Sequence, residues 1–210
     1  MNYKKMVESH PSLKILNSFI AVTLLVTLFI SCRKGSGDEN SSDYFTIEKS
    51  KIGIEVVDEE LGIKFYPPVG WDLQQTAISK KIESRNPANP NEHFVYQPTY
   101  IFFDDSTGGL LSVGKVITND TALTKSARLN YYKGLINSKH KNDNLDTGNF
   151  IHTKIYFSQF KIEKHNLVSF KLIFENKNGE IIEFDYTIPT AHLEGVQPSI
   201  KSSIGSIRSQ

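Results

Sequence analysis

An apolar run from Ile15 to Ile30 ends just before Cys32, the only cysteine among the 210 residues. A run of this kind near the start of a chain leaves only the residues that follow it to form a folded domain. Three lysines precede the run, so a basic segment leads into an apolar one, as in a secretory signal. A helix of this length reaches roughly 24 Å, which is short of a hydrocarbon core of about 30 Å. We therefore expect residues 1–31 to be a removed signal peptide.

The residues before the cysteine resemble the lipoprotein signal class. Its lipobox has an aliphatic residue at −3 and small residues at −2 and −1, and here Phe29, Ile30 and Ser31 precede Cys32. The resemblance implies that Cys32 becomes a lipidated amino terminus that anchors the protein to a membrane of the cell envelope. Arg33 follows in place of the Asp that retains lipoproteins in the inner membrane of enteric bacteria, which favours the outer membrane if the cell has one. An uncleaved anchor, or a cleaved signal with an incidental Cys32, are the alternatives.

The remaining chain divides into a tether and one domain. Residues 33–43 (RKGSGDENSSD) contain no apolar residue, so residues 32–43 are predicted to be a lipidated cysteine and a flexible tether. Residues 44–210 suit a single domain. The signal holds three of the 24 basic and one of the 23 acidic residues, so the mature chain is nearly neutral and has no basic surface for nucleic acid. With one cysteine, no internal disulfide can form.

Periodicity and turn residues predict strands and helices in a definite order. The expected strands are 52–57, 62–66, 100–103, 110–117, 150–162, 167–175 and 180–188. The expected helices are 72–84, 120–139 and 193–207, with Asp72 and Asp120 as N-caps of the first two. The second helix is expected to turn Leu123, Ala127, Tyr131 and Leu135 inward, and loops are expected at 85–98 and 140–148. This order predicts an α+β fold, with a mainly antiparallel sheet layered with about three helices.

Two segments resemble the Mog1/PsbP-like fold, which includes a family of small exported bacterial lipoproteins. One is Gly62–Trp71 (GIKFYPPVGW), similar to that family's opening strand with its Tyr-Pro and Trp. The other is Tyr186–Pro189 followed by a closing helix with Ile200, Ile204 and Ile207. The resemblance implies a binding or assembly domain and carries over no catalytic residue.

The 85–98 loop is the surface on which we expect partner recognition, because long loops within compact domains are often functional. His93, Phe94 and Tyr96 give it aromatic and amphipathic rings. An insertion without consequence is the alternative. Trp71 follows two prolines and either stacks on a partner or fills the core.

No motif in the chain indicates a cofactor, a metal site or a catalytic nucleophile. The histidines lack the spacing of metal ligands, and no serine lies in a nucleophile elbow. The leading hypothesis is therefore a membrane-anchored envelope lipoprotein with a non-catalytic binding domain and an envelope protein as partner. The alternatives are a hydrolase assembled from Asp104, Asp105, His152 and His165, and a lipoprotein that binds a small ligand in a pocket near Trp71.

Overall fold

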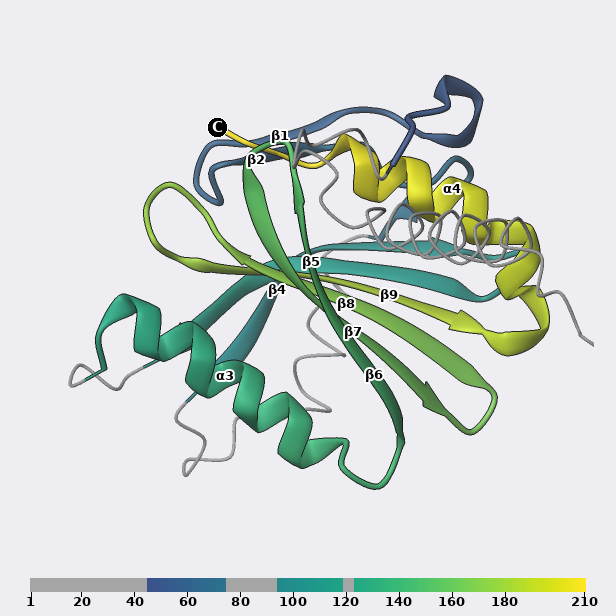
Figure 1. The fold of residues 1–210 in the computed structure, drawn as a ribbon. Helices are drawn as coiled ribbons and strands as arrows, with labels where there is room; N and C mark the ends of the chain where they lie inside the picture. The colour runs from purple at the N-terminus through teal and green to yellow at the C-terminus, as the bar shows by residue number, and fades with distance from the viewer. Residues whose placement is uncertain (1–44, 75–93, 119–122) are drawn as a thin grey trace, which may run out of the picture. The chain divides into compact units, whose positions relative to one another are not determined.

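The computed structural model describes residues 45–74, 94–118 and 123–210 (Figure 1). The predicted signal peptide, Cys32 and the tether lie outside the described residues, as does His93. No helix within the described ranges is long and apolar enough to span a membrane.

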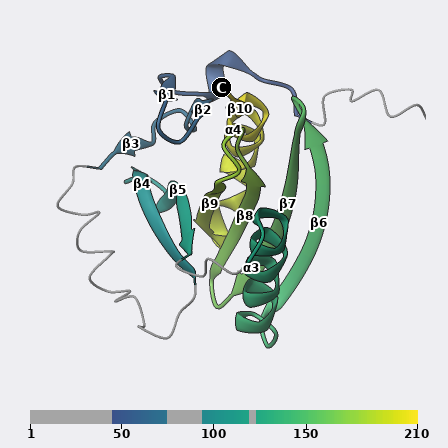
Figure 2. The same ribbon diagram turned by 90° about the vertical axis from the view of Figure 1, so that its left-hand side faces the viewer.

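A seven-stranded sheet dominates the fold, and each strand pairs antiparallel with its neighbours. Figure 2 shows its curvature from β4 and β5 on one side to β7 and β6 on the other. In spatial order the strands are β3 (Asp72–Leu73), β4 (Phe94–Asp104), β5 (Gly109–Thr118), β9 (Ile181–Pro189), β8 (Leu167–Glu175), β7 (Ile155–Lys164) and β6 (Asn144–His152). The α+β class and the mainly antiparallel sheet are thus confirmed.

A smaller sheet joins the start of the domain to its end. Strands β1 (Val56–Asp58) and β10 (Arg208–Ser209) both pair with β2 (Ile63–Phe65). Two short 3₁₀ helices, η1 (Lys49–Lys51) and η2 (Thr190–His192), lie in the connections. The predicted strand from Ile52 is wrong in its first half, because Ile54 is 87% exposed and β1 begins only at Val56.

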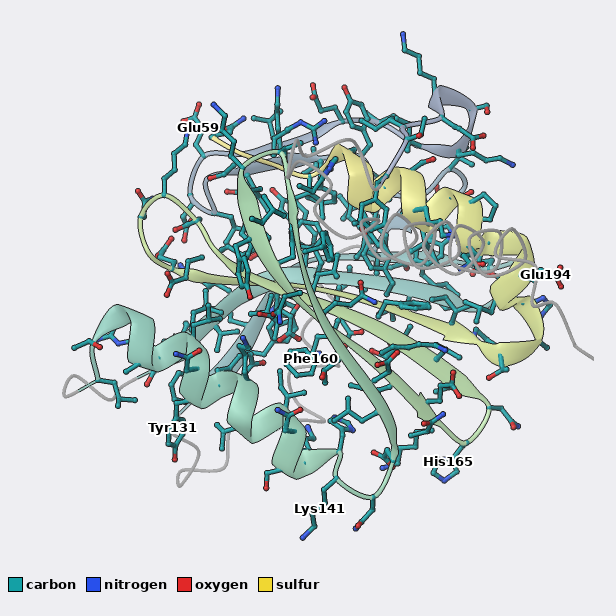
Figure 3. The ribbon with its side chains drawn as sticks, viewed as in Figure 1. Glu59, Tyr131, Lys141, Phe160, His165 and Glu194 are labelled. Atoms are coloured by element: carbon teal, nitrogen blue, oxygen red, sulfur yellow. The ribbon has the colours of Figure 1, made fainter. Side chains whose placement is uncertain are left out.

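The two α-helices of the described residues pack against opposite faces of the large sheet. In β9, alternate residues Ile182, Phe184 and Tyr186 belong to the core that also holds Ile200 and Ile204 of α4 (Leu193–Ser206). The opposite face of the sheet carries a second cluster with Ile136 of α3 (Lys125–Lys139), and Phe160 is part of it (Figure 3). The central strand β9 is therefore covered on both faces, which explains its nearly continuous burial.

The prediction for α3 was wrong about its cap and its buried face. Thr124, whose side chain accepts from the N–H of Ala127, is the N-cap, and Asp120 lies outside the described residues. Leu123 packs against the second cluster as expected, but Tyr131 and Leu135 are 46% and 39% exposed, and their neighbours Tyr132 and Ile136 pack toward the sheet instead. The helix is thus rotated by about one residue from the expected orientation, because Tyr132 has a buried hydrogen-bond partner on the sheet.

Three further expectations need correction. Asp72 and Leu73 pair with β4 as a strand, and the rest of the helix expected over 72–84 lies outside the described residues. The loop expected at 140–148 is shorter, because β6 already begins at Asn144. The strand expected over 150–162 is two strands, because the chain reverses at Thr153 and Lys154.

Candidate functional site

Trp71, a predicted partner-binding residue, lies in the core. It is 5% exposed, and its ring centroid is 6.4 Å from that of Tyr186. The ring lies close to Gly109, where an added Cβ would come within 2.7 Å of it. Trp71 thus packs as part of the core, which is the second of the two roles that the sequence allowed.

Phe94 and Tyr96 belong to β4, so the prediction of a loop up to Pro98 is wrong at its end. Phe94 is 5% exposed and stacks on Tyr131 with a centroid distance of 5.5 Å. Tyr96 is half-buried, and its hydroxyl lies 2.8 Å from Ser112 Oγ. Both rings thus pack within the domain, beneath α3, and do not lie on an open loop.

The residues of the hydrolase hypothesis do not converge. Asp104 lies at the β4–β5 turn, where its carboxylate accepts hydrogen bonds from Ser106 and Thr107 of the same turn. His165 lies at the tip of the β7–β8 hairpin (Figure 3), at least three strand spacings away, or roughly 14 Å. His152 is buried at the other end of β7, about 30 Å along the strand, and its Nε2 lies 2.8 Å from Gly205 O. Asp104, Asp105, His152 and His165 therefore do not form one site.

The structure instead brings charged side chains together between α3 and the sheet, in a group that we call the Lys171 cluster. Lys171 Nζ lies between Glu183 Oε1 and Asp185 Oδ2 and donates to both, at 2.8 Å in the case of Asp185. Glu183 is only 1% exposed. Ser169 Oγ donates to Asp185 Oδ1 at 2.5 Å, so that carboxylate is held on both oxygens.

Two tyrosines complete the Lys171 cluster. The hydroxyl of Tyr132, on α3, donates to Glu183 Oε2 at 2.6 Å. Lys171 Nζ lies 5.9 Å from the ring centroid of Tyr96, within the range of a cation–π interaction. The cluster is defined as Tyr96, Ser112, Tyr132, Ser169, Lys171, Glu183, Asp185 and Thr187.

The surroundings stabilise one protonation state for Lys171, for Asp185 and for the two tyrosines. Burial by itself lowers the pKa of Lys171, but the Asp185 and Glu183 carboxylates outweigh it and raise that pKa. Burial raises the pKa of Asp185, and Lys171 more than reverses this effect, so the pKa of Asp185 is lowered. Burial raises the pKa of Tyr132 and Tyr96, and the charge of Glu183 adds to the effect. Lys171 is therefore held as an ammonium, unlike the free amine that a base or nucleophile requires.

Sequence reasoning missed the Lys171 cluster, although a signal for it was present. Lys171 interrupts the apolar strand 167–175, and Glu183 and Asp185 interrupt the next strand at alternate positions. The hairpin register places Lys171 directly opposite Asp185, where oppositely charged side chains interact. Pairing the two predicted strands through their short turn would have shown the contact.

A groove of about 380 Å³ lies elsewhere, along α4. Its lining residues are Phe45, Thr46, Glu48, Glu194, Gln197, Pro198, Lys201 and Ser202. In the part of the chain that the structure describes, no group of three His, Cys, Asp or Glu residues is arranged to hold a metal ion.

Several solved structures are similar to this chain. One of them is the solution structure of cyanobacterial PsbP (CyanoP) from Synechocystis sp. PCC 6803, with 15% sequence identity and a TM-score of 0.48. The match covers 83% of this chain and all of that one. No protein-family model and no curated protein matches the chain. A PsbP protein is thus a structural neighbour, with a likeness too loose to carry a function across.

Proposed function

We propose that this protein is a lipid-anchored envelope lipoprotein whose domain binds another envelope protein and performs no catalysis. The observation that carries the proposal is the Lys171 cluster. Its ionisable groups are hydrogen-bonded to one another, and Lys171 is held as an ammonium. The cluster therefore serves to hold α3 against the sheet, and it leaves recognition to the surface.

The anchor part of the proposal rests on Cys32 and the apolar run before it. A diacylglyceryl group carries two acyl chains, and each buried CH₂ contributes about 0.8 kcal/mol to membrane binding. Two chains hold a protein stably where one gives only marginal binding. The outer membrane is the proposed destination.

The surface offers apolar side chains for a partner near the start of the domain. Four of them, between residues 54 and 73, are about half exposed or more: Ile54, Val57, Val69 and Leu73. Contiguous exposed apolar patches mark protein-binding surfaces, and we propose that these four side chains contribute to one. This segment, and not the aromatic residues of β4, is the surface that we propose for recognition.

A photo-cross-linking amino acid placed at position 54 in living cells tests this proposal. We expect one discrete cross-linked product with an envelope protein, lost when Val57→Asp puts a charge three positions further along the same segment. The same probe at the exposed Lys141, which follows α3, is the control and should give no such product. Identical products from both positions, or none from position 54, would contradict the proposed surface.

A further inference from the structure

Strand β6 forms one edge of the large sheet, and no strand of the described ranges pairs with its outer side. β6 is nine residues long, whereas β3, the last strand on the opposite side, has two residues and covers only part of β4. Short edge strands are one way in which proteins prevent unwanted pairing, and β6 does not use it.

β6 also lacks the other common protections of an edge. Its sequence, NLDTGNFIH, contains no lysine, arginine or proline and only one charged residue, Asp146. Its register with β7 runs without a bulge from Asn144 to His152. Six of its nine residues are exposed. A long, regular and exposed edge of this kind is a template for another strand.

The turn after β6 determines which backbone groups face outward. Thr153 and Lys154 both have positive φ, at 51° and 67°, and form a two-residue turn between His152 and Ile155. Such a turn closes with a hydrogen-bonded pair, so His152 directs its backbone groups toward β7. Hydrogen-bonded and non-hydrogen-bonded pairs then alternate along an antiparallel ladder. The outward backbone groups of β6 therefore belong to Leu145, Thr147, Asn149 and Ile151.

These four residues match a second copy of the same strand. In an antiparallel arrangement centred on Gly148, Leu145 faces Ile151 of the second copy and Thr147 faces Asn149 of the second copy. An apolar side chain thus meets an apolar one and a polar side chain meets a polar one. All the outward groups find partners, in about eight hydrogen bonds at two per pair. Ile151, which is 53% exposed in one copy, gains an apolar neighbour.

We propose that two copies of this chain associate through β6, in antiparallel register about Gly148, and join their large sheets into one. We assign a second copy of the chain as the partner of β6, because the strand is complementary to itself. In the register centred on Gly148, every outward backbone group of β6 finds a hydrogen-bond partner on the other copy. The proposal goes beyond the binding function above and does not depend on it, since it involves a different surface and no lipid.

A cysteine at the centre of the interface tests the register directly. In the proposed dimer the two copies of residue 148 form a non-hydrogen-bonded pair with Cα atoms about 4.5 Å apart, within the range of a disulfide. A Cβ at Gly148 meets nothing within 4 Å, so Gly148→Cys leaves the fold intact. Oxidation of the full-length variant in membranes should give a disulfide-linked homodimer well above the background that Cys32 gives in the unsubstituted protein.

Asp146→Cys is the matched control on the same strand. Residue 146 faces residue 150 of the second copy, so the two residues 146 lie about 13 Å apart and cannot form a disulfide. Equal dimer yields from the two variants would show random collision and overturn the proposal. So would a Gly148→Cys variant that folds, by circular dichroism, but stays monomeric or links to a different protein.

A second pair of variants tests the outward hydrogen bonds in detergent-solubilised full-length protein. Asn149→Pro removes one outward N–H, which an edge strand tolerates, and should convert the dimer to a monomer in sedimentation equilibrium. Asn149→Ser keeps the N–H and should stay dimeric. A dimeric proline variant, or a monomeric unsubstituted protein, would overturn the proposal.

Discussion

The hydroxyl of Tyr132 lies 2.6 Å from Oε2 of Glu183, and this hydrogen bond links α3 to β9, the central strand of the large sheet. Lys171 of β8 occupies the other oxygen of the same carboxylate. The buried carboxylate of Glu183 thus accepts hydrogen bonds from both α3 and the neighbouring strand β8. The first three predictions follow from this arrangement.

Replacement of Tyr132 by Phe removes the helix-to-sheet hydrogen bond and leaves Glu183 buried with one fewer donor. Hydrogen bonds to charged groups contribute about 1.5–3 kcal/mol, so the free energy of unfolding should fall by about that amount. The measurement is denaturant unfolding. Tyr131→Phe is the control, because Tyr131 is 46% exposed and its change should cost less than about 0.5 kcal/mol. Equal losses in the two variants would show that the contact with Glu183 is unimportant.

Replacement of Lys171 by Met should be more severe, because it leaves two carboxylates without their cation. The loss of one partner of a buried ion pair costs about 3–5 kcal/mol. Lys161→Met breaks the more exposed Lys161–Glu163 pair, with both side chains over one-third exposed, and should cost about 0–1 kcal/mol. Thermal unfolding of both variants checks the difference. A Lys171→Met variant as stable as Lys161→Met would contradict the structural role of the cluster.

The lowered pKa of Asp185 predicts a dependence of stability on acid. A carboxyl group whose pKa is lower in the folded state stabilises the fold above its unfolded pKa of about 3.9 and loses this effect as the pH falls. Asp185→Asn should therefore be less stable at pH 7 and lose less further stability below about pH 4. Unfolding from pH 7 to pH 2 measures this slope, with exposed Asp105→Asn as control. Equal slopes for the unsubstituted protein and Asp185→Asn would contradict the prediction.

Gly114 is predicted to be intolerant of any side chain. It pairs with Pro98 at the irregularity in β4, and an added Cβ would lie 2.1 Å from the carbonyl oxygen of Gln97. Gly114→Ala should therefore displace β4 and lower the melting temperature markedly. Gly134→Ala, on the exposed side of α3 with nothing within 4 Å, should instead stabilise by up to about 1 kcal/mol. Differential scanning calorimetry measures the melting temperatures of both variants. A Gly114→Ala variant with an unchanged melting temperature would contradict the close approach of Gly114 to Gln97.

Strand boundaries were predicted most accurately where the connecting turn consists of residues that are common in turns. The strands 167–175 and 180–188 were placed correctly, to within a residue, because Asn176–Gly179 is a conventional turn between two apolar runs. The reversal at Thr153 and Lys154 was missed because neither residue favours the positive φ that it adopts there. The orientation of α3 was also missed, since its inward face is set by the contact of Tyr132 with Glu183, about 50 positions later in the chain.

The candidate site was harder to predict than the fold. Phe94 and Tyr96 looked like loop residues because they follow a segment rich in proline and asparagine, yet both pair with β5. The contact of Lys171 with Asp185 could be read from the β8–β9 hairpin, but the whole Lys171 cluster draws on five elements, β4, β5, α3, β8 and β9, whose meeting is not visible in local sequence patterns. The lipid anchor, in contrast, is a local motif that can be tested without a structure.

The most direct test of the central claim is metabolic labelling with a radioactive fatty acid in cells that express the protein or its Cys32→Ala variant. We expect label in the unsubstituted protein, with Cys32 as the first residue after cleavage. For the variant we expect an unlabelled precursor that retains residues 1–31. A variant that is still labelled and still cleaved after Ser31, or an unsubstituted protein without label, would show that Cys32 is not a lipidated amino terminus.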